Sequence, residues 1–349
     1  MSLDAAAREK TDHRADVPDG IGVEDALALG NARRGLTHAS FFSGIGGFDL
    51  GFQQAGIKTV SLCEKKEFCR RVLAERWPGV SLFEDVTNVD PKEIPEAKIW
   101  TAGFPCQDLS LARMGPRAGL RGSQSGLFHD FAALVDARRP QVVVLENVHG
   151  LLTSHRGRDF AIVLKTMDEL GYGLAWRVLN SQYFGVPQSR KRVYVVAVHR
   201  DPEGAGKILF EPERGGRDIE ARGSDGKKSP SLFQKILGNP LKGPLVKARA
   251  HCIYAESARH TGTDWSRNYV WYPDGRVRRF TPVEVERVQG FPAGWTDIPA
   301  GEKEDADSLR YHAVGNSVTP AVAQWLGARI ADYVQQGYAE QGALEYARR

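Results

Sequence analysis

The sequence predicts a doubly wound α/β fold, in which helices cover both faces of a mostly parallel sheet. Between Leu36 and about Val198, short apolar runs alternate with helix-like stretches. Several of these runs are apolar throughout, as strands buried on both faces are. After Arg200 the alternation stops, and Gly, Pro and charged residues are frequent up to about Asn268. This change of composition predicts a second, smaller and loop-rich domain.

The expected elements follow one another along the chain. Strands are expected over Thr37–Phe42, Thr59–Cys63, Ile99–Ala102, Val142–Leu145, Gly173–Leu179 and Val193–Ala197. Helices are expected over Gly47–Ala55, Lys66–Trp77, Leu127–Arg138, Asp159–Leu170 (with Gly171 as its stop), Pro282–Gln289 and Pro320–Gln335. Residues 1–36 are polar and lack an apolar signal segment, so we expect a mobile arm, with a short helix near Val23–Asn31, on a cytoplasmic protein.

Composition excludes several classes of protein. The 349 residues are 42% hydrophobic and 26% charged, which is ordinary for a globular protein, and no apolar run is long enough to span a membrane. Four scattered cysteines do not make a disulfide framework, and neither they nor the histidines have metal-ligand spacing. We therefore expect no metal and interpret Cys63, Cys69 and Cys252 as structural or incidental.

The charge is unevenly distributed. The whole chain carries only +4, with a pI of about 8.8. Between Arg200 and Arg279, however, there are 16 Lys/Arg against 10 Asp/Glu, and from Arg222 to Arg249 seven basic residues stand against the single acid Asp225. A basic segment of this kind suits contact with a nucleic-acid backbone, although by itself it fits a solvated loop equally well.

A glycine-rich turn follows the first expected strand, in Phe41-Phe42-Ser43-Gly44-Ile45-Gly46-Gly47-Phe48. Glycines allow a sharp turn and let a ligand approach the N-terminus of the helix, but a plain strand–helix turn explains this segment about as well. Two acids follow in order: Glu64 at the end of the second strand, and Asp85 after a third strand. Either acid alone is typical of a surface charge, whereas the ordered series indicates a nucleoside-containing cofactor.

A single cysteine stands in an unusual position. Cys106 lies within Gly103-Phe104-Pro105-Cys106-Gln107, directly after the apolar run Ile99–Ala102. Free cysteines are mostly small core residues, but a cysteine held rigidly after a proline can be a nucleophile if its thiolate is stabilised.

Two further groups end strands on the same expected edge of the sheet. Glu146 directly follows the apolar run Val142–Leu145, and if protonated it could donate a hydrogen bond into a heterocycle. Arg190 and Arg192 are two residues apart on an extended segment and so point the same way, which would let them hold a phosphate, a carboxylate or a base edge. Taken alone, the two arginines would fit exposed edge charges better.

Together these motifs resemble the C5-cytosine DNA methyltransferases, which use S-adenosylmethionine. The resemblance runs from about His38 to Leu326 in the family's motif order. It rests on Phe-Ser-Gly-Ile-Gly-Gly (42–47), Gly-Phe-Pro-Cys-Gln (103–107) with Ser110, Glu-Asn-Val (146–148), Gln-Ser-Arg-Lys-Arg (188–192), Arg-Phe-Thr-Pro-Val-Glu (279–284), Gln-Gly-Phe-Pro (289–292) and Gly-Asn-Ser-Val (315–318). It implies a Rossmann-like doubly wound methyltransferase domain with a smaller, loop-rich target recognition domain.

The resemblance also implies site residues. The cofactor residues would be Phe42, Ser43, Gly44, Ile45, Gly46, Gly47, Glu64 for the ribose hydroxyls, Asp85 for the adenine amino group, Val86, Phe104, Leu127, Asn316 and Val318. Asn316 and Val318 would return to this pocket because the segment after about Leu309 folds back onto the first domain. Lys65 stands where many members carry an apolar or aromatic residue, and we assign it no role.

The implied chemistry is a covalent methyl transfer without a metal. The Cys106 thiolate would add to carbon 6 of a flipped-out cytosine, so that carbon 5 can take the methyl group. Glu146 would bind ring nitrogen 3, Arg192 the base's carbonyl oxygen, and Arg190 would support the loop or the nucleophile. DNA contacts are expected from Gln107, Ser110, Arg113, Arg121 and Gln188, the middle three on a basic, glycine-rich loop over Leu111–Gln124 or at its start.

Other functions fit less well. An RNA methyltransferase of the tRNA-modifying branch is expected to carry Phe-Thr after its cysteine, whereas Cys106 is followed by Gln-Asp-Leu-Ser. A non-catalytic DNA-binding homologue would lack at least one of the four expected catalytic residues. A thymidylate synthase-type enzyme would not need the series Gly44, Glu64, Asp85, and no Asp/Asn-Pro-Pro-aromatic motif of an amino-methylating enzyme is present.

The resemblance suggests how the chain is divided. We expect an arm over 1–36, a discontinuous catalytic domain over 37–199 and 309–349, a target recognition domain over 200–278, and a hinge over 279–308. The expected partner is double-stranded DNA, recognised by a monomer. A cognate restriction endonuclease, a solitary role and a phage-borne protective role are all compatible with the sequence.

Overall fold

The computed structural model describes residues 35–105, 126–211, 246, 249–253, 268–274, 276–299 and 305–347, with side chains described up to residue 336. The strands are β1 (Thr37–Phe41), β2 (Lys58–Cys63), β3 (Ser81–Phe83), β4 (Ile99–Ala102), β5 (Val142–Val148), β6 (Tyr172–Asn180), β7 (Lys191–His199), β8 (Tyr269–Trp271) and β9 (Val277–Arg279). The α-helices are α2 (Gly47–Gln54), α3 (Glu67–Arg76), α4 (Leu127–Arg138), α5 (Arg158–Glu169), α6 (Gly204–Leu209), α9 (Pro282–Gln289), α10 (Ala306–Asn316) and α11 (Pro320–Ala347).

The predicted doubly wound sheet is confirmed. Seven strands lie in the order β3-β2-β1-β4-β5-β7-β6, and β1 to β5 pair in parallel. Strands β6 and β7 pair antiparallel at one side, so β7 runs against β5 and places Arg192 opposite Val148. The order reverses between β1 and β4, and ligands of such sheets bind beside the carboxyl ends of the strands at this reversal.

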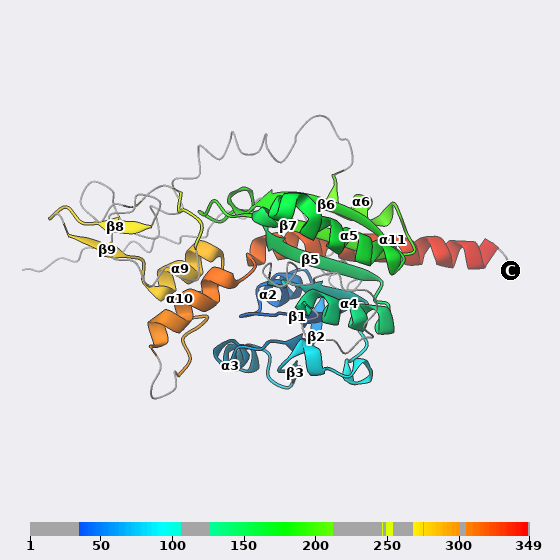
Figure 1. The fold of residues 1–349 in the computed structure, drawn as a ribbon, viewed down its shortest axis with the longest axis horizontal. Helices are drawn as coiled ribbons and strands as arrows, with labels where there is room; N and C mark the ends of the chain where they lie inside the picture. Colours follow the sequence, from blue (N-terminus) through cyan, green and yellow to red (C-terminus); the bar gives the residue numbers. More distant parts are fainter. Residues whose placement is uncertain are drawn as a thin grey trace, which may run out of the picture.

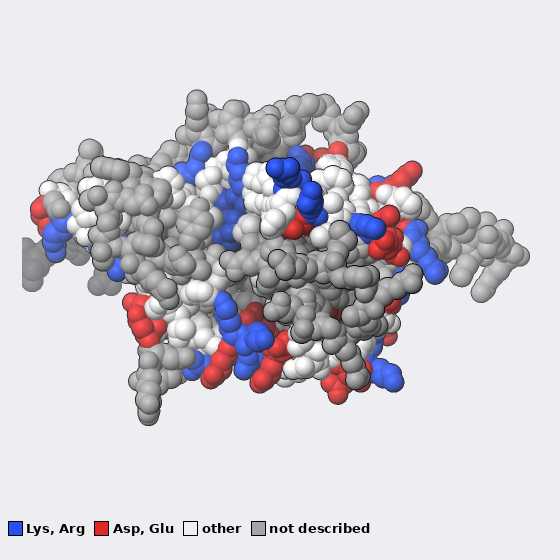
Figure 2. All heavy atoms as spheres, viewed as in Figure 1, with Lys and Arg blue, Asp and Glu red and all other residues white. Residues whose placement is uncertain are grey.

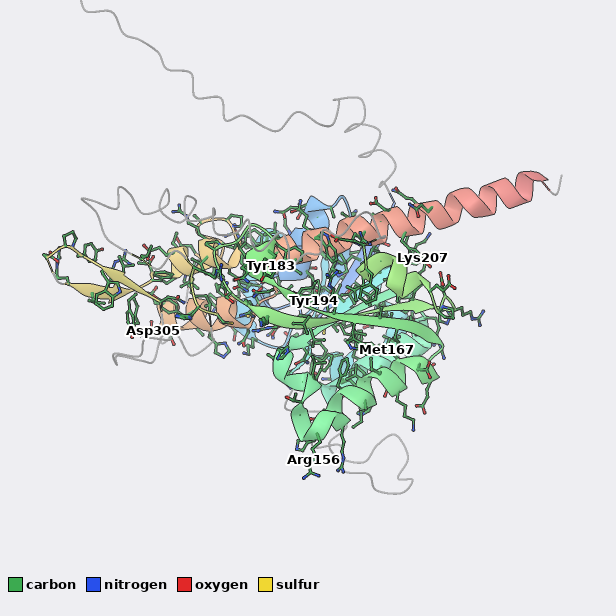
Figure 3. The ribbon with its side chains drawn as sticks, turned by 90° about the horizontal axis from the view of Figure 1, so that it is seen from above. Arg156, Met167, Tyr183, Tyr194, Lys207 and Asp305 are labelled. Atoms are coloured by element: carbon green, nitrogen blue, oxygen red, sulfur yellow. The ribbon has the colours of Figure 1, made fainter. Side chains whose placement is uncertain are left out.

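Helices cover both faces of the sheet, and each face has its own core (Figure 1). One core contains Phe41, Trp100, Phe131 of α4 and Met167 of α5. The opposite core contains Phe52 of α2, together with side chains of α6 and α11. Met167 and Tyr194 belong to these opposite faces of the sheet (Figure 3).

A smaller module lies beyond the carboxyl edge of the sheet (Figure 1). It contains the β8–β9 hairpin, α9 and α10, and a third core joins it to α3 through residues such as Trp77, Val270 and Trp295. Helix α9 begins with a capping box between Thr281 and Glu284. The described part of this module is therefore packed against the sheet domain and is not an independent body.

The chain returns from this module to the sheet along α11, which packs against α2. Two glycines on α2 make the approach close. A Cβ atom on Gly47 would lie 2.3 Å from the Val318 carbonyl oxygen, and one on Gly51 would lie 2.4 Å from that of Pro320. No side chain fits at either position, so the glycines serve this helix packing as well as the turn before α2.

Several expected boundaries shift for local reasons. Strand β1 ends at Phe41, because Phe42 has a left-handed backbone with φ 53°. Lys66 is the N-cap of α3 and not part of it, and β6 and β7 are longer than expected. Gly171, with φ 82°, does follow α5 as a stop. The expected short helix near Val23–Asn31 lies outside the described residues.

Two helices had no expected counterpart. Helix α6 packs against β6, β7 and α11, so the sheet domain runs on to Leu209. Helix α10 begins at the N-cap Asp305, whose carboxylate accepts from the Ser308 N–H, and Asp305 lies toward one end of the smaller module (Figure 3). It is the helix that carries the chain to Asn316.

A buried polar network lies under the first turn. The Asp49 carboxylate on α2 accepts from the hydroxyls of Ser40 and Thr59 at 3.1 and 3.2 Å. The imidazole of His38 is 2.8 Å from the Thr101 hydroxyl, and its Nδ1 is 3.5 Å from Asp49. Burial raises the pKa of Asp49 to about 7 and lowers the pKa of His38 to about 3, so both are neutral in the folded protein at mildly acid pH.

We predict that Asp49→Asn changes how stability depends on pH. Folded Asp49 keeps its proton up to about pH 7, whereas its ordinary pKa is 3.8. Its contribution is therefore complete below pH 3.8 and is lost as the pH rises toward 7. The asparagine does not titrate, so the free energy of unfolding of the variant, minus that of the wild type, should increase by up to about 1.4 kcal/mol per pH unit between pH 4.5 and 6.5. Urea unfolding at several pH values measures this difference, and a difference that is constant with pH would contradict the assignment.

Candidate active site

The glycine-rich turn is tied to the end of β2. The Ser43 N–H and hydroxyl both donate to the Cys63 carbonyl, at 3.0 and 3.2 Å, and the Cys63 N–H lies 3.2 Å from the Ser43 oxygen. Phe42, Gly44 and Gly46 all have positive φ values. Because Phe42 is not a glycine, its conformation costs roughly 1–3 kcal/mol, and the hydrogen bonds of Ser43 help to hold it.

Glu64 is buried at the carboxyl end of β2 and fastens the same turn. One carboxylate oxygen accepts from the Gly44 N–H and the other from the Lys66 N–H, both at 2.8 Å. Each oxygen keeps a further lone pair, so the carboxylate can still accept hydrogen bonds from ligand hydroxyls. Glu64 thus supports the turn and offers acceptors at once.

Asp85 follows β3 and is held on both oxygens. It accepts from the Thr87 N–H at 3.1 Å and forms an ion pair with Lys65 at 2.9 Å. Burial alone would raise the pKa of Asp85, but the hydrogen bonds from Lys65 and Thr87 outweigh it and lower the pKa. Lys65, to which the sequence assigned no role, therefore contacts a predicted cofactor residue directly.

Glu146 and Arg192 meet at the ends of β5 and β7. Arg192 Nε lies 3.2 Å from Glu146 Oε1, and both side chains are largely buried. Burial raises the pKa of Glu146, and the charges of Arg192 and Arg190 oppose this rise. A carboxyl group balanced in this way can change its protonation state when a ligand binds.

Asn147 fixes the segment that leads to Cys106. Its side-chain amide donates to the Phe104 carbonyl at 2.8 Å, and its oxygen accepts from the Val148 N–H at 2.8 Å. The end of β5 thereby holds Phe104 and Pro105, the last described residues before Cys106.

These groups line one pocket of about 610 Å³ at the carboxyl edge of the sheet. One half contains Glu64 and Asp85, and the other contains Glu146 and Arg192. Phe42 after β1 and Gly103 after β4 lie between the halves, which is where the strand order reverses. Cys63 and Cys69 also line the pocket, but burial raises the pKa of each thiol to about 12, so neither is a thiolate.

Beside the pocket, a buried hydrogen-bond network joins the three predicted motifs at 188–192, 289–292 and 315–318. The Arg190 guanidinium, 1% exposed, donates to the carbonyls of Ile253 (2.9 Å), Gly315 (3.1 Å) and Ser317 (2.8 Å). The Gln289 amide also donates to the Ser317 carbonyl, at 2.8 Å. Since Gly315 and Ser317 flank Asn316, these bonds set the position of Asn316 at the pocket.

Gln188 belongs to this network and not to the surface. Its side chain is 0% exposed, donates to Gln289 Oε1 at 2.6 Å and accepts from the Ile253 N–H at 2.9 Å. A side chain so enclosed offers nothing to DNA, and the expected DNA contact is replaced by a structural role. The sequence shows the motif Gln-Ser-Arg-Lys-Arg at 188–192, but it does not show that the side chain of Gln188 is buried.

The comparisons with known proteins agree with this arrangement. The family model described as C-5 cytosine-specific DNA methylase matches residues 36–214 and 240–332. The chain belongs to this family. Its members are DNA methyltransferases, so the chain is an enzyme of DNA cytosine methylation.

Among curated relatives, the Type II methyltransferase M2.BsuMI of Bacillus subtilis (strain 168) is 33% identical over 303 residues, which is 84% of this chain and 74% of the relative. M.NgoBI of Neisseria gonorrhoeae is 35% identical over 267 residues, 72% of this chain and 81% of the relative.

Solved structures show the same fold at lower identity. The Dnmt2 methyltransferase of S. pombe superposes with a TM-score of 0.60 at 16% identity, over 86% of this chain and 99% of that chain. A putative DNA modification methyltransferase encoded within an E. coli prophage gives a TM-score of 0.54 at 18% identity, over 86% of this chain and 99% of that chain.

The methyltransferase pocket brings together most of the predicted site residues that the structure describes. Those that line it are Phe42, Gly44, Glu64, Asp85, Val86, Phe104, Leu127, Glu146, Arg190, Arg192 and Asn316. Ser43, Ile45, Gly46, Gly47 and Val318 lie behind the lining and support the turn or the return of α11. Cys106, Gln107, Ser110, Arg113 and Arg121 lie outside the described residues.

Sequence reasoning missed several lining residues. Lys66 and His312 line the pocket, as does Asn147. His312 lies one helical turn before Asn316, so predicting α10 would have found it. Within the ranges that the structure covers, no three His, Cys, Asp or Glu side chains are placed to hold a metal ion, and no helix is long and apolar enough to cross a membrane.

We predict that Arg190→Lys destabilises the methyltransferase by about 2–4 kcal/mol, because one ammonium cannot serve the separated carbonyls that the planar guanidinium joins. The exposed Arg156 lies in the short 3-10 helix Ser154–Gly157 before α5 (Figure 3). It provides a matched Arg156→Lys control that should change stability by less than about 0.5 kcal/mol. Urea unfolding of both variants measures the effect, and equal stabilities would contradict the role given to Arg190.

Proposed function

We propose that this methyltransferase transfers a methyl group from S-adenosylmethionine to carbon 5 of a cytosine flipped out of duplex DNA, with Cys106 as a covalent nucleophile. The observation that carries the proposal is the pocket itself. Its Glu146–Arg192 half is continuous with its Glu64–Asp85 half and lies beside Phe104 and Pro105, which lead directly into Cys106.

The residues present fit the cofactor that enzymes of this family use. Glu64 and Asp85 offer acceptors for the ribose hydroxyls and the adenine amino group. Phe42, Val86 and Leu127 provide apolar lining, and the backbone of Gly44 allows close approach beside the turn. When bound, the cofactor supplies an electrophilic methyl group.

The residues of the other half suit activation of a cytosine. The Cys106 thiolate would form a bond to carbon 6. The electron pair of the carbon 5–carbon 6 double bond would then form a double bond between carbons 4 and 5, and the pair of the carbon 4–nitrogen 3 double bond would move to nitrogen 3. Glu146, whose pKa burial raises, would hold a proton at ring nitrogen 3 and so neutralise the charge that develops. After carbon 5 has gained the methyl group, loss of its proton to a base would re-form the double bond and expel the thiolate.

Two arginines would orient the base. Arg192, which pairs with Glu146, would donate to the carbonyl oxygen next to nitrogen 3. Arg190 lines the pocket, and its buried Nε has no hydrogen-bond partner among the described atoms. We propose that this donor serves the base or the segment that follows Pro105.

Duplex DNA would bind across the mouth of the pocket, because cytosine must leave the base stack to reach it. On the face in Figure 2, basic side chains gather above the centre, and acidic and basic side chains are mixed elsewhere. Further contacts are proposed from Gln107, Ser110, Arg113 and Arg121. Because several relatives are named Type II methyltransferases, we propose a protective role in a restriction–modification system, with the protein acting as a monomer.

We predict that the wild-type enzyme forms a covalent complex with DNA containing 5-fluorocytosine in its recognition sequence when S-adenosylmethionine is present. After methyl transfer, carbon 5 carries fluorine and no proton, so the thiolate cannot be expelled. Denaturing gel electrophoresis measures the shifted band. Cys106→Ser should give no shifted band, because a serine hydroxyl is not ionised at neutral pH.

Glu146→Gln keeps the thiol and the shape of the pocket. This variant should form the same complex at a rate at least about a hundredfold lower than that of the wild type. A shifted band of wild-type intensity from Cys106→Ser would show that the bond is not made by this cysteine.

A further inference from the structure

Three side chains meet at the rim of the pocket, beside its Glu64–Asp85 half. Lys66 Nζ lies 3.3 and 3.4 Å from the two ring nitrogens of His312, and the Asn316 side-chain nitrogen lies 3.2 and 3.4 Å from the same ring. Lys66 precedes α3, whereas His312 lies 246 residues further along the chain on α10, one turn before Asn316. All three line the pocket.

This cluster has more hydrogen-bond donors than it can use. An ammonium group has three donors and no acceptor, and an amide nitrogen has two donors. A neutral imidazole has one acceptor nitrogen, and a protonated imidazole has none. His312 can therefore accept from at most one of these two side chains, and at least one of their donors remains for an anion.

The other cations of the pocket are already engaged. Lys65 pairs with Asp85, Arg192 pairs with Glu146, and Arg190 is bonded to backbone carbonyls. In the described ranges, no carboxylate lies within ion-pair distance (4.0 Å) of Lys66. Among the lysines and arginines that line the described pocket, the Lys66 ammonium is the one bonded to neither a carboxylate nor a backbone carbonyl, so it is available to a negatively charged ligand group.

We propose that Lys66, His312 and Asn316 form the subsite for the carboxylate of the cofactor's amino-acid end. The inference rests on the proposed function, and it extends it by assigning roles to Lys66 and His312. S-adenosylmethionine carries one anionic group, this carboxylate, while its adenosine end presents hydroxyl and amino donors.

The pocket matches this division. Acceptors from Glu64 and Asp85 would face the donors of the adenosine, and the donor-rich cluster would face the carboxylate. The carboxylate's oxygens would provide enough acceptors for all three side chains and would join α10 to the start of α3 around the ligand.

The test compares S-adenosylmethionine with decarboxylated S-adenosylmethionine, which lacks only this group, by isothermal titration calorimetry on the full chain. The wild type should bind the complete cofactor at least about tenfold more tightly. Lys66→Met should weaken binding of the complete cofactor about tenfold and change binding of the decarboxylated analogue less than about twofold. His312→Leu, a second variant, should show the same selective loss.

Lys65→Met is the matched control, because it removes the same charge from the neighbouring position. Since Lys65 pairs with Asp85 at the other end of the ligand, this variant should alter the binding of both compounds by the same factor. The ratio of the two affinities should therefore stay at its wild-type value.

Equal weakening of both compounds by Lys66→Met would overturn the proposal, because it would show no contact with the carboxylate. So would unchanged binding of S-adenosylmethionine together with weaker binding of duplex DNA, which would assign Lys66 to a phosphate. If the wild type bound neither compound, the proposed function itself would fail.

Discussion

The buried hydrogen bonds of Arg190 are the constraint on which the rest of the site depends. One guanidinium on the segment entering β7 binds carbonyls of residue 253 and of the two residues that flank Asn316. Gln188 and Gln289 close the same network through the Ile253 N–H and the Ser317 carbonyl. Three motifs that are far apart in the sequence are therefore held at one point, and the pocket is assembled where they meet.

The parallel sheet determines where the pocket lies. Because β1 to β5 are parallel, the residues that follow them reach one edge, and the reversal between β1 and β4 leaves space there. The polar residues that line the pocket fall into three groups. Glu64 and Asp85 offer hydrogen-bond acceptors, and Glu146 and Arg192 form a carboxyl–guanidinium pair. The third group offers donors and consists of Lys66, His312 and Asn316. Burial keeps the thiols of Cys63 and Cys69 protonated, so neither competes for the nucleophilic role that we propose for Cys106.

The sequence predicts the sheet well because its strands are short apolar runs with clear glycine stops, and strand ends are where Glu64, Asp85 and Glu146 stand. It does not predict which polar residues are buried. Gln188 was expected to face DNA, yet it is enclosed by contacts with residues 253 and 289 that no local pattern reveals. Lys65 and Lys66 were missed because a lysine after a strand is typical of solvent, and only the folded chain brings Asp85 and His312 to them. Helix α10 has its buried residues only near its end, at 313–315, so no apolar stripe along the helix indicated it.

We propose that this pocket methylates carbon 5 of cytosine in DNA. Bisulfite sequencing tests it most directly, because 5-methylcytosine resists the deamination that converts cytosine. Duplex DNA of varied sequence would be incubated with the protein and S-adenosylmethionine, and an equal amount of RNA would be treated in parallel. Cytosines at one position of a short DNA sequence should stay unconverted, and those of the RNA should convert. Complete conversion of the DNA, or protection confined to RNA, would contradict the proposed function.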